Sequence, residues 1–156
     1  PGASRDPLTR VVNESFIGRT LPPSPPYQVG REKIREFATA IGETSPLCHD
    51  AAAAREAGHP DLVAPPTFPV VFTMPRIELL LRDPEFGWGF EGTVHGDQKI
   101  EFIRPIHAGD ELVTTVRGVD LRTRAGTHML TLNCAVTGDG EPVCNTEALL
   151  LRQEQA

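Results

Sequence analysis

Apolar side chains fill almost every position of residues 68–81, where only Arg76 and Glu78 are charged. This composition predicts a helix that other elements enclose, because the helix has no polar face to turn toward water. Thr67 is placed to cap such a helix. Pro69 suits its first turn, where the missing N–H of proline costs no hydrogen bond. We therefore expect a central buried helix around which the rest of the chain is organised.

Prolines delimit and interrupt this helix. Pro65 and Pro66 cannot continue a helix from upstream, and Pro75 removes an interior hydrogen bond. A kink or a break is therefore expected within residues 71–75. Residues 21–27 are also rich in proline, which predicts an extended surface segment in place of a helix or a central strand.

Two shorter helices are predicted upstream. Residues 30–42 place apolar side chains on one helical face and charges on the other, as in a surface helix. Residues 50–58 predict a second helix, capped by Asp50 and closed by Gly58. The loop between them, residues 43–49, holds the densest cluster of reactive side chains in the chain.

Beyond residue 81 the apolar spacing changes from helical to alternating, which is typical of strands. Glycine-containing turns separate four candidate strands. The strands are expected at residues 92–105, 111–122, 128–137 and 142–152. Helices followed by consecutive antiparallel strands indicate an α+β fold, with one face of the sheet laid on the apolar helix.

The last hairpin allows its register to be predicted. A three-residue loop at residues 138–140 sets Cys134 directly opposite Cys144 and keeps Glu147 away from the core. A two-residue loop would instead set Glu147 against Leu132. We therefore expect the three-residue loop and two adjacent, reduced thiols.

Composition narrows the classes of protein. The chain has 156 residues, 39% of them hydrophobic, which indicates one globular domain at residues 14–156 after a disordered tail at residues 1–13. A net charge of −6 disfavours nucleic acid and membrane surfaces as partners. Neither a signal peptide nor an apolar run of about 20 residues is recognisable, so a cytoplasmic location is expected.

Cysteine and histidine spacing excludes several chemistries. Three cysteines without a secretory signal favour reduced thiols. The histidines lie at no metal-ligand spacing, and neither a phosphate-binding glycine loop nor a Gly-x-Ser-x-Gly motif occurs. The sequence therefore predicts no metal and no cofactor.

The remaining candidate for catalysis is the pair Glu43 and His49, since a carboxylate and an imidazole held close can divide acid and base work. Alternatively, Glu43 is a solvated loop carboxylate and Asp50 only a helix cap.

Three motifs then point to a family. The run VGREKIREFA from Val29, GHPDLVAPPTFP from Gly58 and VHGDQKIEFIRPIHAGD from Val94 closely resemble the actinobacterial MaoC-like dehydratases with a FAS1-like dehydratase domain. The resemblance covers residues 16–152. It implies a hot-dog fold, in which an antiparallel sheet wraps a central helix. It also implies dehydration of (3R)-hydroxyacyl thioesters, or hydration of trans-2-enoyl thioesters, carried on CoA or acyl-carrier protein.

The chain departs from the catalytic pattern of that family. Catalytic members carry the loop GDxNPLHxD, where this chain has GETSPLCHD. Glu43 stands at the Asp position and Cys48 at the His position, with His49 one place late. Such a shift moves a side chain by about 3.8 Å, which is more than proton transfer tolerates without rearrangement. Pro66 stands where a glycine N–H is expected to hold the thioester carbonyl, and proline has no N–H.

These departures resemble the accessory subunits of the family, which line an acyl channel while a partner with an intact loop supplies acid and base. The resemblance implies a homodimer or such a heterodimer, and an apolar sheet edge also favours pairing. Substrate-binding positions implied by the family are Pro66, Thr67, Phe68, Phe72, His95 and Gln98. An acyl tunnel and ordinary core packing both account for the apolar side chains of the central helix, which are Phe68, Val71, Phe72, Met74 and Leu79.

Three alternatives stay open at this point. In the first, the chain is a non-catalytic domain that binds acyl thioesters. In the second, it is a homodimeric hydratase that uses Glu43 and His49, which requires the loop to repack with Cys48 inward. The third is a thioesterase, for which the central helix offers only Glu78 as a carboxylate.

Overall fold

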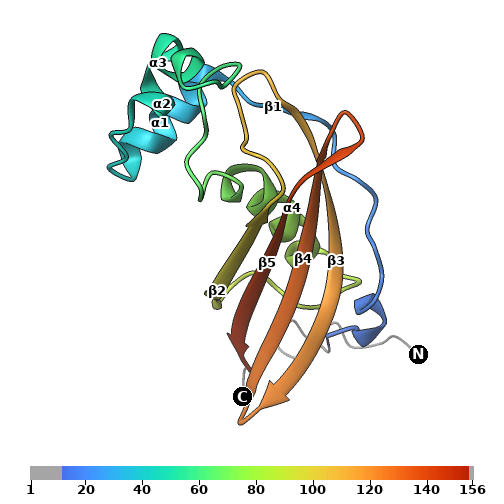
Figure 1. The fold of residues 1–156 in the computed structure, drawn as a ribbon. Coiled ribbons are helices and arrows are strands. Elements are labelled where there is room, and N and C mark those ends of the chain that lie inside the picture. The colour runs from blue at the N-terminus through green and yellow to red at the C-terminus, as the bar shows by residue number, and fades with distance from the viewer. Residues whose placement is uncertain (1–11, 155–156) are drawn as a thin grey trace, which may run out of the picture.

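A five-stranded antiparallel sheet curls around helix α4 in the computed structural model, which describes residues 12–154 (Figure 1). The helices are η1 (Glu14–Phe16), α1 (Arg31–Ala40), α2 (Pro46–His49), α3 (Ala51–Glu56) and α4 (Val70–Arg82). The strands are β1 (Tyr27–Gln28), β2 (Thr93–Phe102), β3 (Glu111–Arg124), β4 (Thr127–Gly138) and β5 (Glu141–Gln153). Their order in the sheet is β1-β3-β4-β5-β2. This is the α+β hot-dog arrangement that the sequence predicts.

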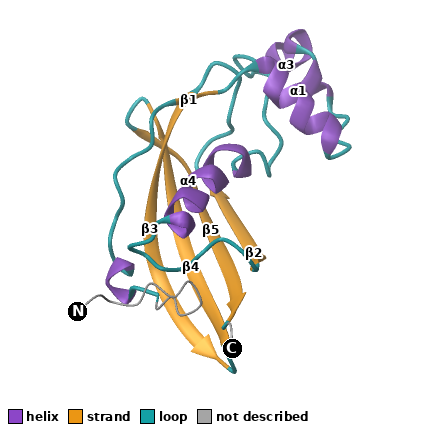
Figure 2. Cartoon of the chain, turned by 180° about the vertical axis from the view of Figure 1, so that it is seen from behind, coloured by secondary structure: helices purple, strands orange, loops and turns teal. Residues whose placement is uncertain are grey.

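Helix α4 lies against one face of the sheet, as Figure 2 shows from behind. Ile77 and Leu81 on the helix are almost fully buried, and they share one core cluster with Leu130 and Leu132 of β4. Burying a Leu or Ile side chain contributes about 1.5–3 kcal/mol, so this layer is a principal source of stability. The long strands and the helix therefore form the scaffold on which the remaining segments rest.

The start of α4 differs from the prediction. The helix begins at Val70 after Pro69, and no side chain caps it, so Thr67 is not its cap. Of the kink or break expected within residues 71–75, the break is absent, because the helix runs through Pro75 without interruption. In the first turn of the helix, the Thr73 hydroxyl donates a 2.9 Å hydrogen bond to the carbonyl of Pro69, four residues earlier.

The β4–β5 hairpin also differs. Its turn has two residues, Asp139 and Gly140, with φ angles of +50° and +78°. Two positive φ angles in succession suit the tight turns that match the twist of paired strands. Val143 then has no partner on β4, so a β-bulge shifts the register beyond it.

This bulge corrects the predicted cysteine pairing. Cys134 lies opposite Thr146, and Cys144 lies opposite Val136, so the two thiols are diagonal neighbours rather than direct partners. Both are buried on the same sheet face and neither is in a disulfide, as predicted. Glu147 still faces away from the core, opposite Asn133. The bulge thus keeps Glu147 away from the core, which is the result that the three-residue loop was expected to give.

The N-terminal segment packs on the fold earlier than expected. Val12 is buried, and the Asn13 side chain accepts a 3.1 Å hydrogen bond from the Ser15 N–H at the start of η1. Both residues belong to the fold, although the predicted tail included them. The rest of that predicted tail, residues 1–11, lies outside the described residues.

The proline-rich segment covers one edge of the sheet. Within the predicted extended segment of residues 21–27, residues 21–26 adopt neither helix nor strand, and Tyr27 begins the edge strand β1. The Leu21 N–H donates to the Val116 carbonyl and the Ser24 N–H to the Thr114 carbonyl, each at 2.8 Å. The outer side of β3 is therefore hydrogen-bonded, whereas β2 is the last strand at the other edge of the sheet among residues 12–154.

Helices α1 to α3 form a cap at one end of the sheet, beyond the start of α4 (Figure 1). The prediction for α3 is confirmed, because the Asp50 carboxylate accepts hydrogen bonds from the Ala52 and Ala53 N–H groups at 2.8 and 3.4 Å. The segment predicted as a loop contains α2, a single turn capped by Ser45. Within residues 12–154, no helix is long and apolar enough to cross a membrane.

Candidate functional site

A cavity of about 450 Å³ opens where the cap meets the start of α4 and the end of β2. Three stretches of chain form its wall: the loop after α1, the segment before α4, and the segment after β2. The lining residues are Glu43, Ser45, Leu47, Cys48, Val63, Ala64, Pro65, Pro66, Phe102, Ile103, Arg104, Pro105 and Ile106. Most of this wall is apolar, with one carboxylate and one thiol beside each other on the cap side.

Glu43 is held by the way α1 ends. Gly42 adopts a φ of +74°, which turns the chain, and the Glu43 N–H then donates to the Ala38 carbonyl at 2.8 Å. The Glu43 carboxylate accepts a 2.8 Å hydrogen bond from the Ser45 N–H. The backbone therefore fixes this carboxylate at the pocket wall.

Cys48 occupies the pocket-facing position next to it. Its side chain is buried, and the helical turn α2 directs it into the wall of the cavity. Burial and the nearby Glu43 carboxylate raise the pKa of the Cys48 thiol. At neutral pH it is therefore a neutral thiol, which makes it a poor base and a poor nucleophile.

His49 does not line the cavity. Its Nε2 lies 2.7 Å from the main-chain oxygen of Glu43. A carbonyl oxygen only accepts hydrogen bonds, so Nε2 carries the proton. Arg35 donates from Nε to the His49 carbonyl at 3.0 Å and fixes the same residue from the helix side. The imidazole thus ties the ends of the loop together and does not contact the Glu43 carboxylate.

The start of α4 supplies the opposite wall. Pro66, one of the predicted substrate-binding positions, lines the cavity and offers no N–H to a carbonyl. Thr67 is exposed and is not among the lining residues. Phe68 and Phe72 are buried beneath, where Phe68 meets Phe37 edge-on, with ring centroids 5.5 Å apart. These two side chains support the wall and do not form its surface.

The remaining predicted positions lie on β2. His95 is exposed, and Gln98 is partly buried with its Nε2 donating to the Lys99 carbonyl at 3.4 Å. Neither belongs to the cavity wall. Leu79, expected inside the tunnel, is 61% exposed on the outer flank of α4.

Sequence reasoning missed the end of β2 and the segment that follows it. Phe102 and Ile103 line the cavity although both are more than 40% exposed, at 42% and 59%. Arg104 joins them and forms a two-bond ion pair with Asp110, at 2.8 and 3.0 Å. The motif FIRPIHAGD contained a signal for this ion pair, since the basic Arg104 and the acidic Asp110 flank a short loop. The ends of this loop meet only in the folded chain.

Among the described residues, no cluster of three or more His, Cys, Asp or Glu side chains is arranged to hold a metal ion.

Comparison with known proteins gives the class of this domain. Residues 15–146 match the family model described as "FAS1-like, dehydratase domain region". The chain therefore belongs to this family of MaoC-like dehydratases, as its motifs indicate.

Individual relatives agree with this assignment. A UPF0336 protein of Saccharopolyspora erythraea is 47% identical over 146 residues, which cover 93% of this chain and 94% of the relative. A solved MaoC-like dehydratase matches with a TM-score of 0.82 and 32% identity over 90% of this chain, which spans 43% of that longer chain. The HadBC (3R)-hydroxyacyl-ACP dehydratase complex from Mycobacterium tuberculosis matches with a TM-score of 0.76 and 30% identity, covering 87% of this chain and 96% of the other.

Proposed function

We propose that this chain is the accessory subunit of a (3R)-hydroxyacyl-thioester dehydratase or trans-2-enoyl-thioester hydratase that acts on acyl-CoA or acyl-carrier protein. In this role it lines the channel for the acyl chain, and a MaoC-like partner with an intact loop supplies acid and base. The observation that carries the proposal is the position of Cys48. It faces the cavity beside Glu43, while the imidazole of His49 is hydrogen-bonded outside it.

The chemistry shows what this pocket lacks. Hydrating an enoyl thioester needs a base for the attacking water, an acid for the α-carbon and a donor that polarises the carbonyl. For the acid and base roles, the wall provides the Glu43 carboxylate. Cys48 has a raised pKa, and Pro66 has no N–H. A carboxylate alone does not divide acid and base work between two groups.

The same wall suits an acyl chain. Small-molecule sites are typically about 300–1,000 Å³ and mostly apolar, and this cavity is about 450 Å³ with a largely apolar lining. Glu78, the only carboxylate that α4 offers to a thioesterase, is paired with Arg82 at 2.8 Å and does not line the cavity. Acyl binding is therefore better supported than thioester hydrolysis at α4.

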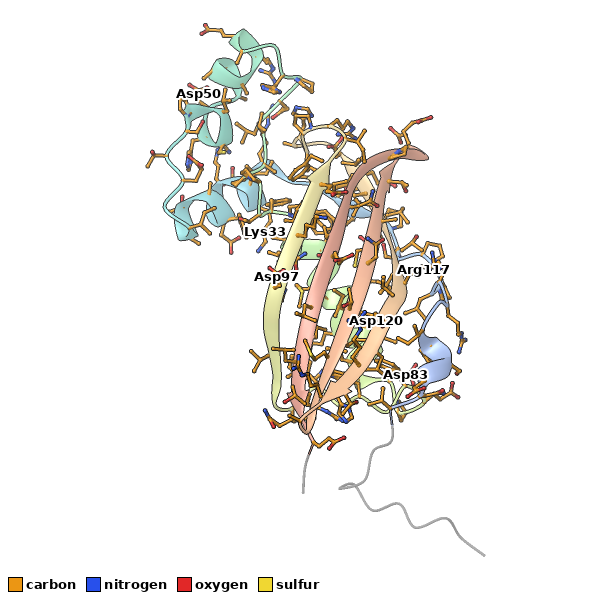
Figure 3. The ribbon with its side chains drawn as sticks, turned by 60° about the horizontal axis from the view of Figure 1, so that its bottom comes forward. Lys33, Asp50, Asp83, Asp97, Arg117 and Asp120 are labelled. Atoms are coloured by element: carbon orange, nitrogen blue, oxygen red, sulfur yellow. The ribbon has the colours of Figure 1, made fainter. Side chains whose placement is uncertain are left out.

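The open edge of the sheet supports pairing with a second hot-dog subunit. Strand β2 exposes unpaired backbone groups together with Val94 and Phe102, which are 60% and 42% exposed. Figure 3 shows this edge at Asp97, across the sheet from Arg117 on β3, whose outer side the N-terminal segment covers. The similar HadBC protein is named as a complex, which agrees with a two-subunit assembly.

Val94→Glu tests this edge without touching the cavity. The substitution places a charge where the sheet of the partner subunit would desolvate it. We therefore expect the affinity between the two subunits to fall at least about tenfold. Sedimentation at micromolar concentration measures the change. Val119→Glu is the matched control, because Val119 is also exposed, at 45%, but lies on β3. Equal association of wild type and Val94→Glu would show that β2 is not the interface.

Turnover tests the function itself. The assay follows the loss of absorbance of crotonyl-CoA or a longer trans-2-enoyl-CoA, for the chain alone and for its complex with an intact-loop subunit. Turnover confined to the complex supports the accessory role. Robust turnover by the chain alone that disappears in both His49→Ala and Glu43→Gln would assign a homodimeric hydratase instead. Binding of acyl-CoA without turnover in either form would assign a non-catalytic binding domain.

A further inference from the structure

Two histidines from distant parts of the chain meet beside the cavity. His59 follows α3 in the cap, and His107 lies in the loop between β2 and β3. Nδ1 of His59 and Nε2 of His107 are 3.0 Å apart, with ring centroids 5.2 Å apart and an interplanar angle of 47°. Both rings are partly buried. Their hydrogen bond joins the cap to the sheet.

This bond lies next to a short ladder that forms part of the cavity wall. The Ala64 N–H donates to the Ile106 carbonyl at 2.8 Å, and the Ala108 N–H donates to the Leu62 carbonyl at 2.9 Å. Ala64 and Ile106 both line the cavity. The histidine pair therefore fastens the two segments whose contact closes this side of the wall.

The pair tolerates only certain protonation states. A hydrogen bond between two imidazoles needs an N–H on one ring and a lone pair on the other, which the neutral and singly protonated pairs provide. When both rings are protonated, no lone pair faces the contact and two positive charges lie about 3 Å apart. The contact then becomes repulsive.

Charged groups around the pair are mostly neutralised by one another. The Asp110 carboxylate accepts a 2.9 Å hydrogen bond from the main-chain N–H of His107 and is paired with Arg104. Asp61 is paired with Arg31 at 2.7 Å and with Arg55 at 3.4 Å. Burial lowers the pKa of His107, Asp110 and Asp61 raise it, and His59 and Arg104 lower it further. The balance favours the neutral ring at neutral pH.

We propose that the His59–His107 pair is a pH-sensitive latch on the cavity wall, closed near neutral pH and opened when both rings are protonated. Opening separates the segment before α4 from the loop after β2 and loosens the wall at Ala64 and Ile106. The latch acts on the wall whatever ligand the cavity holds, so it does not depend on the accessory role.

The sign of the pH dependence follows from the lowered pKa of His107. Its neutral form stabilises the fold fully above the unfolded value of about 6.5. That contribution is lost as the pH falls from there through the lower folded value. Closure is therefore expected at pH 7.5 and opening in the acidic range.

Hydrogen exchange of the intact chain described above tests the latch. Between pH 7.5 and pH 5.0, the protection factors of the Ala64 and Ala108 amides are expected to fall about tenfold relative to Leu132 in the central strand β4. Glutamine is neutral at both pH values, so His59→Gln and His107→Gln should each abolish this drop. His95→Gln, at an exposed histidine on β2, is the matched control and should retain it.

Two results would overturn the proposal. One is a wild-type chain whose Ala64 and Ala108 protection does not change relative to Leu132 between the two pH values. The other is a drop that persists undiminished in His59→Gln and His107→Gln, since groups other than the pair would then cause it.

Discussion

Purified alone, the chain is expected to hydrate trans-2-enoyl-CoA at least about 10³-fold more slowly than its complex with a subunit that carries an intact GDxNPLHxD loop. A positioned acid or base typically contributes about 10²–10⁴-fold, and a carbonyl donor about 10²–10³-fold. The wall lacks a usable imidazole because His49 bonds to the main-chain oxygen of Glu43, and Pro66 offers no N–H to a carbonyl at the start of α4. Even partial overlap of the two losses leaves about three orders of magnitude.

Initial rates of crotonyl-CoA hydration measure this difference at equal concentrations of active sites. The partner subunit alone is the necessary control, since its activity shows how much the present chain adds to the complex. A chain that alone reaches within about tenfold of the complex would contradict the expectation.

The second large effect is a gain of activity in the double variant Cys48→His, Pro66→Gly. The first substitution places an imidazole at the buried, cavity-facing position beside Glu43, and the second provides an N–H at the start of α4. We expect hydration by the variant to exceed that of the wild-type chain at least about 10²-fold, the lower end of what one acid or base contributes.

The matched control is Cys48→Asn, Pro66→Gly, which adds a polar side chain of similar reach that cannot exchange a proton near neutral pH. It is expected to remain at the wild-type level. Circular dichroism of both variants verifies that they fold. A folded Cys48→His, Pro66→Gly variant with wild-type activity would show that position 48 does not face the reacting atoms.

The elements of the fold were predictable because each follows a local pattern. Alternating apolar residues marked the four long strands, and Asp50 marked the start of α3. The register of the last hairpin was not predictable, since the bulge at Val143 compensates a two-residue turn and leaves no distinct pattern in the sequence. Leu79 was assigned to the interior on composition, which does not reveal that one flank of α4 remains uncovered.

The candidate site was only partly predictable for a similar reason. The resemblance located Glu43, Cys48 and Pro66, and the structure brings all three to one cavity. It did not show that His49 bonds to a main-chain oxygen, because that contact depends on how α2 turns. The contact between His59 and His107 spans 48 residues, and no spacing rule connects two such positions.

The central claim is that the Glu43–His49 loop of this chain carries no acid–base chemistry. The most direct measurement is the rate of enoyl-CoA hydration by the complex in which Glu43→Gln is introduced into this chain only. The Ser45 N–H then still has an amide oxygen to bond, which preserves the loop. We expect a rate within about twofold of that of the wild-type complex, while the corresponding Asp→Asn change in the partner's loop should lower the rate at least about 10²-fold. A comparable loss from Glu43→Gln in this chain would contradict the central claim.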